Sequence, residues 1–125
     1  MRQFLLLLSI LLFACTAPGQ GSGSLDATGF DARLTEQGAQ LLDVRTAGEF
    51  QGGHLAEARN FDWTNGELEA IAPKLDKSKP VLLYCASGRR SAAARDFLVK
   101  QGFTDVVDLS GGIGAWNSAG KPVVQ

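Results

Sequence analysis

Residues 81–91 read Val-Leu-Leu-Tyr-Cys-Ala-Ser-Gly-Arg-Arg-Ser. The four apolar residues at 81–84 are typical of a buried strand. Residues 91–101 carry apolar side chains at three- and four-residue spacing, which predicts a helix with Ser91 as its N-cap. The stretch therefore predicts a strand, a loop that starts at Cys85, and a helix.

The same alternation extends in both directions along the chain. Short apolar runs predict further strands at 41–44 and 106–109, with a shorter one at 58–61. Helical spacing predicts helices at 31–37 and 65–75. Strands that alternate with helices indicate an α/β fold with a mainly parallel sheet and helices on both faces.

The predicted loop favours a thiolate at Cys85. Parallel sheets bind ligands at the carboxyl ends of their strands, and the unpaired N–H groups and dipole of a following helix stabilise negative charge. Gly88 allows a positive φ, so that loop N–H groups can form an anion-binding nest. Arg89 and Arg90 add positive charge. We therefore expect a Cys85 pKa below the usual value of about 8.5 and a nucleophilic sulfur.

The alternative interpretation is a buried structural thiol, because cysteine is among the most buried residue types. The glycine, the two arginines and the helix start argue against an apolar environment. Zinc binding is excluded by ligand count, since Cys85 and His54 cannot fill a tetrahedron.

Three motifs resemble one family. The loop at 85–90 resembles the Cys-x-x-Gly-x-Arg active loop of rhodanese-like sulfurtransferases. Upstream, Leu-Asp-Val-Arg at 42–45, with Glu-Phe, Gly-His-Leu and Ala-x-Asn after it, resembles the family's first signature. Downstream, Leu-Ser-Gly-Gly-Ile-Gly-Ala-Trp at 109–116 resembles its C-terminal signature. The motifs follow the family's order and cover residues 41 to about 123.

The resemblance implies a rhodanese-like domain over 25–125, with a sheet of about five strands and no cofactor. Its activity would be sulfur transfer from thiosulfate or a persulfide, through a persulfide on Cys85, to cyanide or a thiol acceptor. The substrate-binding residues implied are Ala86, Ser87, Gly88, Arg89, Arg90 and Ser91. Arg90 would close the loop and contribute to anion binding, whereas the role of Arg89 rests on its charge alone. We expect a monomer.

Other residues of the motifs are interpreted as structural. Arg45 and Glu49 are expected to form an ion pair, and Asp43 to bind backbone groups near its strand end. His54 is interpreted as a structural histidine of a turn, because an ionised thiol needs no base to remove its proton. Trp116 is expected in the core.

Two other functions use a cysteine in such a loop. Cysteine-dependent phosphatases and arsenate reductases have a Cys-x5-Arg loop, which would need arginine where this chain has Ser91, so we rank them low. A non-catalytic persulfide carrier or redox-sensing binding domain would also use Cys85, and only turnover distinguishes it from an enzyme.

The N-terminal residues resemble an export signal. Residues 1–14 have a positive start and an apolar run too short to span a membrane, and Leu-Phe-Ala-Cys at 12–15 resembles the lipobox of bacterial lipoproteins. We expect lipidation of Cys15, a flexible tether over 15–24 and a periplasmic domain anchored to the outer membrane. Cleavage after Ala17, which gives a soluble periplasmic protein, is the alternative.

Charge argues against two classes of partner. The chain has 12 Lys and Arg against 13 Asp and Glu, a formal net charge of −1, and no run of basic residues. Nucleic acid and anionic lipid surfaces are therefore poor candidate partners.

Overall fold

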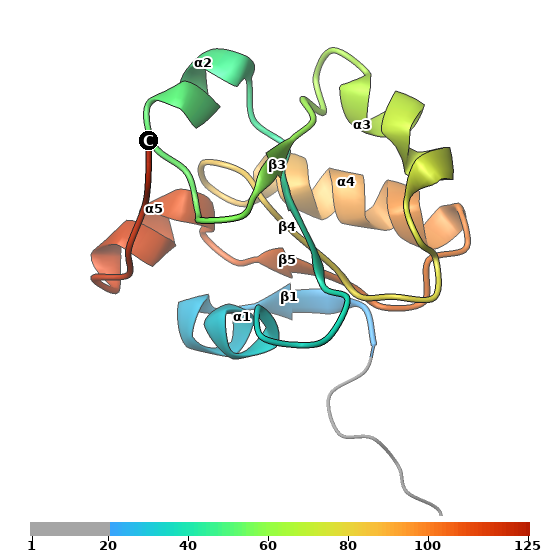
Figure 1. Ribbon diagram of the computed structural model, residues 1–125, viewed down its shortest axis with the longest axis horizontal. Coiled ribbons are helices and arrows are strands. Elements are labelled where there is room, and N and C mark those ends of the chain that lie inside the picture. The colour runs from blue at the N-terminus through green and yellow to red at the C-terminus, as the bar shows by residue number, and fades with distance from the viewer. Residues whose placement is uncertain (1–20) are drawn as a thin grey trace, which may run out of the picture.

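Five parallel strands form the sheet in the computed structural model, which describes residues 21–125 (Figure 1). The strands are β1 Gly23–Leu25, β2 Gln40–Asp43, β3 Arg59–Asn60, β4 Val81–Tyr84 and β5 Val106–Leu109. Their order across the sheet is β1-β5-β4-β2-β3. The strand β4 is central, and Asp43 at the end of β2 pairs with Tyr84 at the end of β4. The segments that follow these two strands therefore leave the sheet side by side.

Helices cover both faces of the sheet, as predicted for an α/β fold. They are α1 Ala27–Arg33, α2 Ala47–Gln51, α3 Glu67–Ile71, α4 Arg89–Lys100 and α5 Gly112–Ser118, with the 3-10 helix η1 Ala72–Lys74 directly after α3. No helix within residues 21–125 is long and apolar enough to cross a bilayer.

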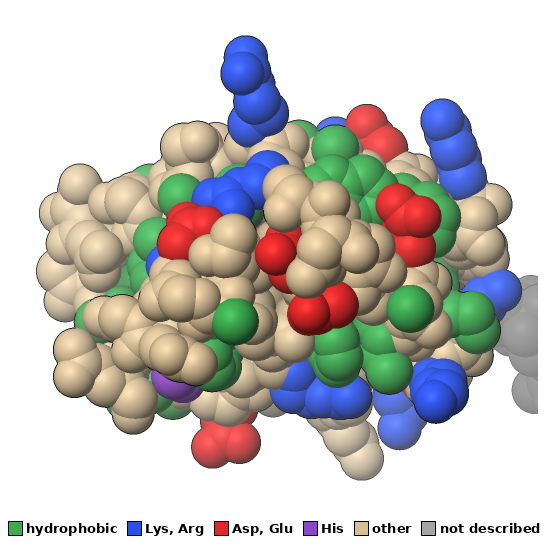
Figure 2. Space-filling model, turned by 90° about the horizontal axis from the view of Figure 1, so that it is seen from above, with side chains coloured by type: hydrophobic (Ala, Val, Ile, Leu, Met, Phe, Trp, Pro, Cys, Tyr) green, Lys and Arg blue, Asp and Glu red, His purple; other side chains and the backbone are tan. Residues whose placement is uncertain are grey.

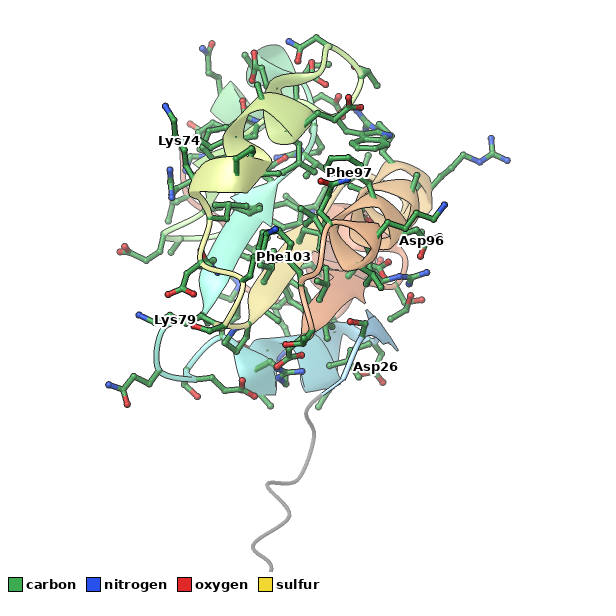
Figure 3. The ribbon with its side chains drawn as sticks, turned by 90° about the vertical axis from the view of Figure 1, so that its right-hand side faces the viewer. Asp26, Lys74, Lys79, Asp96, Phe97 and Phe103 are labelled. Atoms are coloured by element: carbon green, nitrogen blue, oxygen red, sulfur yellow. The ribbon has the colours of Figure 1, made fainter. Side chains whose placement is uncertain are left out.

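Alternate side chains of each strand enter two separate cores, because successive residues of a strand point to opposite faces. The core beneath α3 and α4 contains Leu42, Val44, Leu68, Ala72, Leu75, Val81, Leu83, Cys85, Ala94, Leu98, Phe103 and Val106. The core beneath α1 and α5 contains Ala27, Phe30, Leu41, Leu55, Leu82, Tyr84, Val107, Leu109 and Trp116. Figure 3 shows Phe97 and Phe103 on the inner side of α4 and Asp96 on its outer side. Trp116 is 3% exposed, which confirms its predicted place in the core.

The strands predicted at 81–84 and 106–109 are confirmed, whereas the fold begins earlier than predicted. Gly23 and Ser24, expected in the tether, belong to the edge strand β1, and the Ser24 hydroxyl donates to Asp108 at 2.7 Å. Backbone pairing with β5 needs no apolar side chain, so a Gly-Ser segment can form a strand despite its linker-like composition. The predicted signal at 1–14, Cys15 and the tether up to residue 20 lie outside the described residues.

Two helices differ in position from their predictions for local reasons. The first covers Ala27–Arg33 rather than 31–37, because the Asp26 carboxylate caps it by accepting a hydrogen bond from the Gly29 N–H at 2.8 Å. The helix predicted at 65–75 is divided into α3 and η1, with Pro73 in the 3-10 turn. Proline lacks the N–H that a continuous α-helix would use there.

The helices α2 and α5 were not among the predicted elements. The first begins with a capping box, in which Thr46 and Glu49 bond each other's backbone N–H groups. This Thr-x-x-Glu pattern is a readable helix-start signal. The second begins at Gly112 with Gly111 as its N-cap, and the φ angles of Gly111 and Gly112 are 75° and 60°. A glycine pair more often indicates a turn, and it conceals the helix start in the sequence.

The start of α5 holds the loop that follows β4. The Ile113 N–H donates to the Cys85 carbonyl at 2.9 Å, and the Gly114 N–H donates to the Ala86 carbonyl at 3.2 Å. Gly112 lies so close that an added Cβ would be 2.5 Å from the carbonyl oxygens of Cys85 and Ala86. The position therefore requires glycine for its conformation and for space.

This close approach predicts that Gly112→Ala destabilises the fold strongly. The left-handed conformation alone costs alanine about 1 kcal/mol, and overlap with the loop backbone should raise the total to about 3 kcal/mol or more. Gly120→Ala is the matched control, because Gly120 has a φ of 71° and open space around its Cα. Denaturant unfolding should give a loss of about 1 kcal/mol for the control. Equal losses of unfolding free energy for the two variants would contradict the prediction, because they would show that the loop backbone moves to make room for the methyl group.

Candidate active site

Cys85 lies directly after β4, at the end of the sheet where α2 and α5 also lie (Figure 1). The residue is 1% exposed and belongs to the core beneath α3 and α4. The buried-thiol interpretation is therefore correct about its burial. Its hydrogen bonds, however, differ from those of a thiol in an apolar environment.

Hydrogen-bond donors surround the sulfur. The Gly88 N–H is 3.1 Å from Cys85 Sγ, and the Ser91 hydroxyl is 3.5 Å from it. Burial by itself raises the pKa of the Cys85 thiol, but hydrogen bonds from the Ser91 hydroxyl and from the N–H groups of Ser91, Gly88 and Ser87 outweigh it. The net effect lowers the Cys85 pKa, because these donors stabilise the thiolate more than the thiol.

Ser91 does not cap α4, contrary to the prediction. The helix starts at Arg89 with Gly88 as N-cap, in a left-handed conformation with φ 102°. Ser91 is fully buried in the first turn, where its hydroxyl lies 3.3 Å from the Gly88 carbonyl as well as near the sulfur. The loop between strand and helix is consequently only 85–88, and Ser91 contacts the nucleophile itself.

Arg90 lies close enough to interact with Cys85, but its guanidinium is paired with Glu49. Its Nη1 donates to Glu49 Oε1 at 2.8 Å and its Nη2 to Glu49 Oε2 at 2.9 Å. The hydrogen bonds from Arg90 lower the pKa of the Glu49 carboxyl to about 2, so both groups are charged at neutral pH. The predicted Arg45–Glu49 ion pair is therefore wrong, since Glu49 joins α2 to the start of α4.

Arg45 instead pairs with Asp43. Its Nη2 is 2.6 Å from Asp43 Oδ2, and the same guanidinium donates to the Gly53 carbonyl at 2.7 Å. Asp43 also accepts from the Arg45 N–H at 2.9 Å, which confirms the predicted contact between Asp43 and nearby backbone. The Tyr84 hydroxyl accepts from the Leu55 N–H at 3.0 Å, and burial raises the pKa of this tyrosine. This network fixes the segments on both sides of α2.

The remaining predicted loop residues are more accessible. Ser87 and Arg89 are exposed, and Ala86 and Gly88 are partly buried. Within residues 21–125, the Arg89 side chain is in no ion pair. The positive charge of Arg89 is therefore exposed, whereas the positive charge of Arg90 is neutralised by Glu49.

His54 has the structural role that the sequence indicated. Its Nδ1 is 2.9 Å from the Phe50 carbonyl oxygen, and its ring stacks on the Phe50 ring with 3.7 Å between centroids. Its backbone pairs with Val124 near the C-terminus. These contacts fasten the C-terminal residues to the segment after α2.

A cavity of about 280 Å³ lies between α2 and α5. Its lining includes Glu49, Ile113, Asn117 and Val123. None of residues 85–91 lines the cavity, but two lining residues bind the loop region: Glu49 binds Arg90, and the Ile113 N–H binds the Cys85 carbonyl. No spacing rule in the sequence brings these residues together.

The chain is similar in sequence to known proteins. A thiosulfate sulfurtransferase GlpE of Pseudomonas savastanoi pv. phaseolicola is 39% identical over 85 residues, which are 68% of this chain and 78% of that protein. A protein of the same name from Pseudomonas aeruginosa is 34% identical over 86 residues, which are 69% of this chain and 76% of its own.

Solved structures share the fold. A rhodanese-related protein of Thermoplasma volcanium superposes with a TM-score of 0.71 at 35% identity, covering 81% of this chain and 96% of that protein. The family model of the rhodanese-like domain matches residues 26–119. The chain therefore belongs to the rhodanese-like domain family.

Proposed function

We propose that the protein is a sulfurtransferase that carries a sulfane sulfur as a persulfide on Cys85. The observation that carries this proposal is the set of donors around Cys85 Sγ, with Gly88 N–H at 3.1 Å and the Ser91 hydroxyl at 3.5 Å. Such donors favour a reactive thiolate in a site that otherwise excludes water. The relatives named thiosulfate sulfurtransferases support the same reaction class.

In the first half-reaction, the Cys85 thiolate attacks the outer sulfur of thiosulfate. A new sulfur–sulfur bond forms to Cys85 as the bond within thiosulfate breaks, and sulfite leaves with the electron pair. A persulfide donor R–S–SH reacts in the same way and leaves as the thiolate R–S⁻. Neither reaction needs an external oxidant, because the oxidised sulfur arrives with the donor.

In the second half-reaction, an acceptor attacks the outer sulfur of the Cys85 persulfide. Cyanide gives thiocyanate and a thiol gives a new persulfide, and Cys85 leaves as a thiolate in either case. The donors that stabilise the resting thiolate therefore also stabilise the leaving group. General-base help is not required at this step, which agrees with the structural role of His54.

Ser91 supports sulfur transfer over phosphate chemistry. It occupies the position at which the Cys-x5-Arg loop of a phosphatase has its arginine, and it is buried against the sulfur. A buried serine hydroxyl can stabilise one sulfur atom but cannot neutralise a phosphate dianion.

We further propose that the protein is exported and lipid-anchored. The support is in the sequence alone, where a positive start, an apolar run and Leu-Phe-Ala-Cys at 12–15 precede a Gly-rich segment. Thr16 rather than aspartate follows Cys15, which favours the outer membrane as the site of anchoring. Lipidation of Cys15 would leave Cys85 as the only thiol.

The first prediction concerns turnover. Wild-type protein should form thiocyanate from thiosulfate and cyanide, and Cys85→Ser should reduce the rate at least about 10³-fold, because serine does not form a persulfide. Thiocyanate is measured colorimetrically, and a circular dichroism spectrum checks the fold. Turnover by Cys85→Ser at the wild-type rate would remove Cys85 from the mechanism. Sulfur loading without turnover would favour the persulfide carrier.

The second prediction concerns the thiolate. Ser91→Ala removes a donor that stabilises the charged form, so the Cys85 pKa should rise and alkylation at neutral pH should slow about tenfold. The pH dependence of iodoacetamide alkylation measures both effects. Thr64→Ala is the control, since Thr64 is an exposed hydroxyl residue that bonds Asp62 instead. An unchanged profile in Ser91→Ala would exclude its hydroxyl from stabilising the thiolate.

The third prediction concerns location. In a bacterial host, wild-type protein should incorporate labelled palmitate and fractionate with membranes, whereas Cys15→Ser should do neither, because the acceptor thiol is absent. An unlabelled, soluble periplasmic wild type would contradict the anchor and leave export standing. Retention of the full chain in the cytosol would contradict both.

A further inference from the structure

The charge of Arg90, which interacts with the nucleophile Cys85, is already neutralised. Both oxygens of the Glu49 carboxylate accept from the Arg90 fork, at 2.8 and 2.9 Å, which is a bidentate pair. Glu49 raises the pKa of Arg90, and the nearby Cys85 contributes to the same shift. A loop that attracts anions through Arg90 would leave that guanidinium free. This loop gives it a carboxylate partner.

Glu49 is held in place from its own helix. The N–H and the hydroxyl of Thr46 donate to Glu49 Oε1 at 3.3 and 3.1 Å, which forms the capping box of α2. The carboxylate therefore has two anchors, one on α2 and one on α4. Figure 2 shows acidic side chains interspersed with basic ones on the upper face of the molecule.

The two donor classes place different charges in this loop. Thiosulfate is a dianion. When the Cys85 thiolate attacks it, three negative charges come together in the loop. The sulfur atoms of a protonated small-molecule persulfide carry no negative charge. When the Cys85 thiolate attacks such a persulfide, the only negative charge on the reacting atoms is that of the thiolate. In both reactions one sulfur–sulfur bond forms and another breaks, with the electron pair leaving on sulfite or on R–S⁻. Positive charge at Arg90 therefore matters much more for thiosulfate than for a persulfide.

We propose that Glu49 is a specificity-determining residue that neutralises Arg90 and so favours persulfide donors of low charge over the thiosulfate dianion. This inference rests on the proposed sulfur transfer through Cys85. It assigns Glu49 a role in donor selection beyond the capping of α2. Arg89, which is exposed and outside the ion pairs of residues 21–125, supplies the positive charge that thiosulfate can still use.

The test compares the rate of sulfur loading from two donors. Full-length wild type and Glu49→Gln are mixed with thiosulfate or with cysteine persulfide, quenched, and analysed by intact mass for the gain of one sulfur atom. Glutamine keeps the shape and the capping bonds but not the charge. The thiosulfate-to-persulfide ratio of rate constants should rise about tenfold in Glu49→Gln, and the gain should shrink at high salt because exposed charges are screened.

Two further variants separate charge from structure. Asp76→Asn removes one negative charge before β4, at the opposite end of the sheet from Cys85, and should leave the ratio unchanged. Arg90→Gln leaves Glu49 uncompensated and should lower the ratio. The double variant Glu49→Gln/Arg90→Gln should return it to within about threefold of wild type, because the net charge of the pair is again zero.

The outcomes distinguish this inference from the function on which it rests. If Cys85 gains no sulfur from either donor, the proposed sulfurtransferase function falls. If loading occurs but Glu49→Gln leaves the thiosulfate-to-persulfide ratio unchanged or lowers it, only the role of Glu49 in donor selection is contradicted. Glu49 then orients Arg90 or caps α2. A tenfold rise that Asp76→Asn reproduces would assign the effect to overall charge and would also overturn the inference.

Discussion

The geometry of the site depends on two hydrogen bonds from the start of α5 to the loop after β4. The N–H groups of Ile113 and Gly114 bind the carbonyls of Cys85 and Ala86, at 2.9 and 3.2 Å. With these carbonyls directed at α5, the loop's own N–H groups are available to the sulfur. Gly112 permits this contact because it has no Cβ. A helix almost thirty residues away in sequence thus determines which backbone groups face the nucleophile.

The reactivity of Cys85 is the outcome of two opposed effects. Burial disfavours the thiolate, and it would leave an inert thiol if it acted alone. Each hydrogen bond to a charged group contributes about 1.5–3 kcal/mol, so a few well-placed donors are enough to reverse the effect of burial. The donors here are one side-chain hydroxyl and several backbone N–H groups, whereas Arg90 is engaged by Glu49. The loop therefore stabilises the sulfur anion mainly through dipoles rather than through a free arginine.

Much of this arrangement was predictable from the sequence, and the reasons for the failures are physical. The strands β4 and β5 are short, mainly apolar runs bounded by turn residues, and the position of Cys85 directly after β4 could be predicted from that pattern. The edge strand β1 has a linker-like composition and forms only because β5 is there to pair with it. The pairing of Glu49 with Arg90 joins residues 41 positions apart, so no local rule could choose it over the nearer Arg45. The role of Ser91 was mistaken because a serine before a helical pattern resembles an N-cap, and Gly88 caps the helix instead.

The central claim is that Cys85 carries sulfur as a covalent persulfide. It is tested most directly by intact-mass analysis of the protein after incubation with thiosulfate, with peptide mapping to locate the added atom, and again after cyanide. The account predicts a gain of one sulfur atom on the peptide that contains Cys85, and its complete loss to cyanide. A protein that gains no sulfur, or that gains it at a residue other than Cys85, would contradict the account.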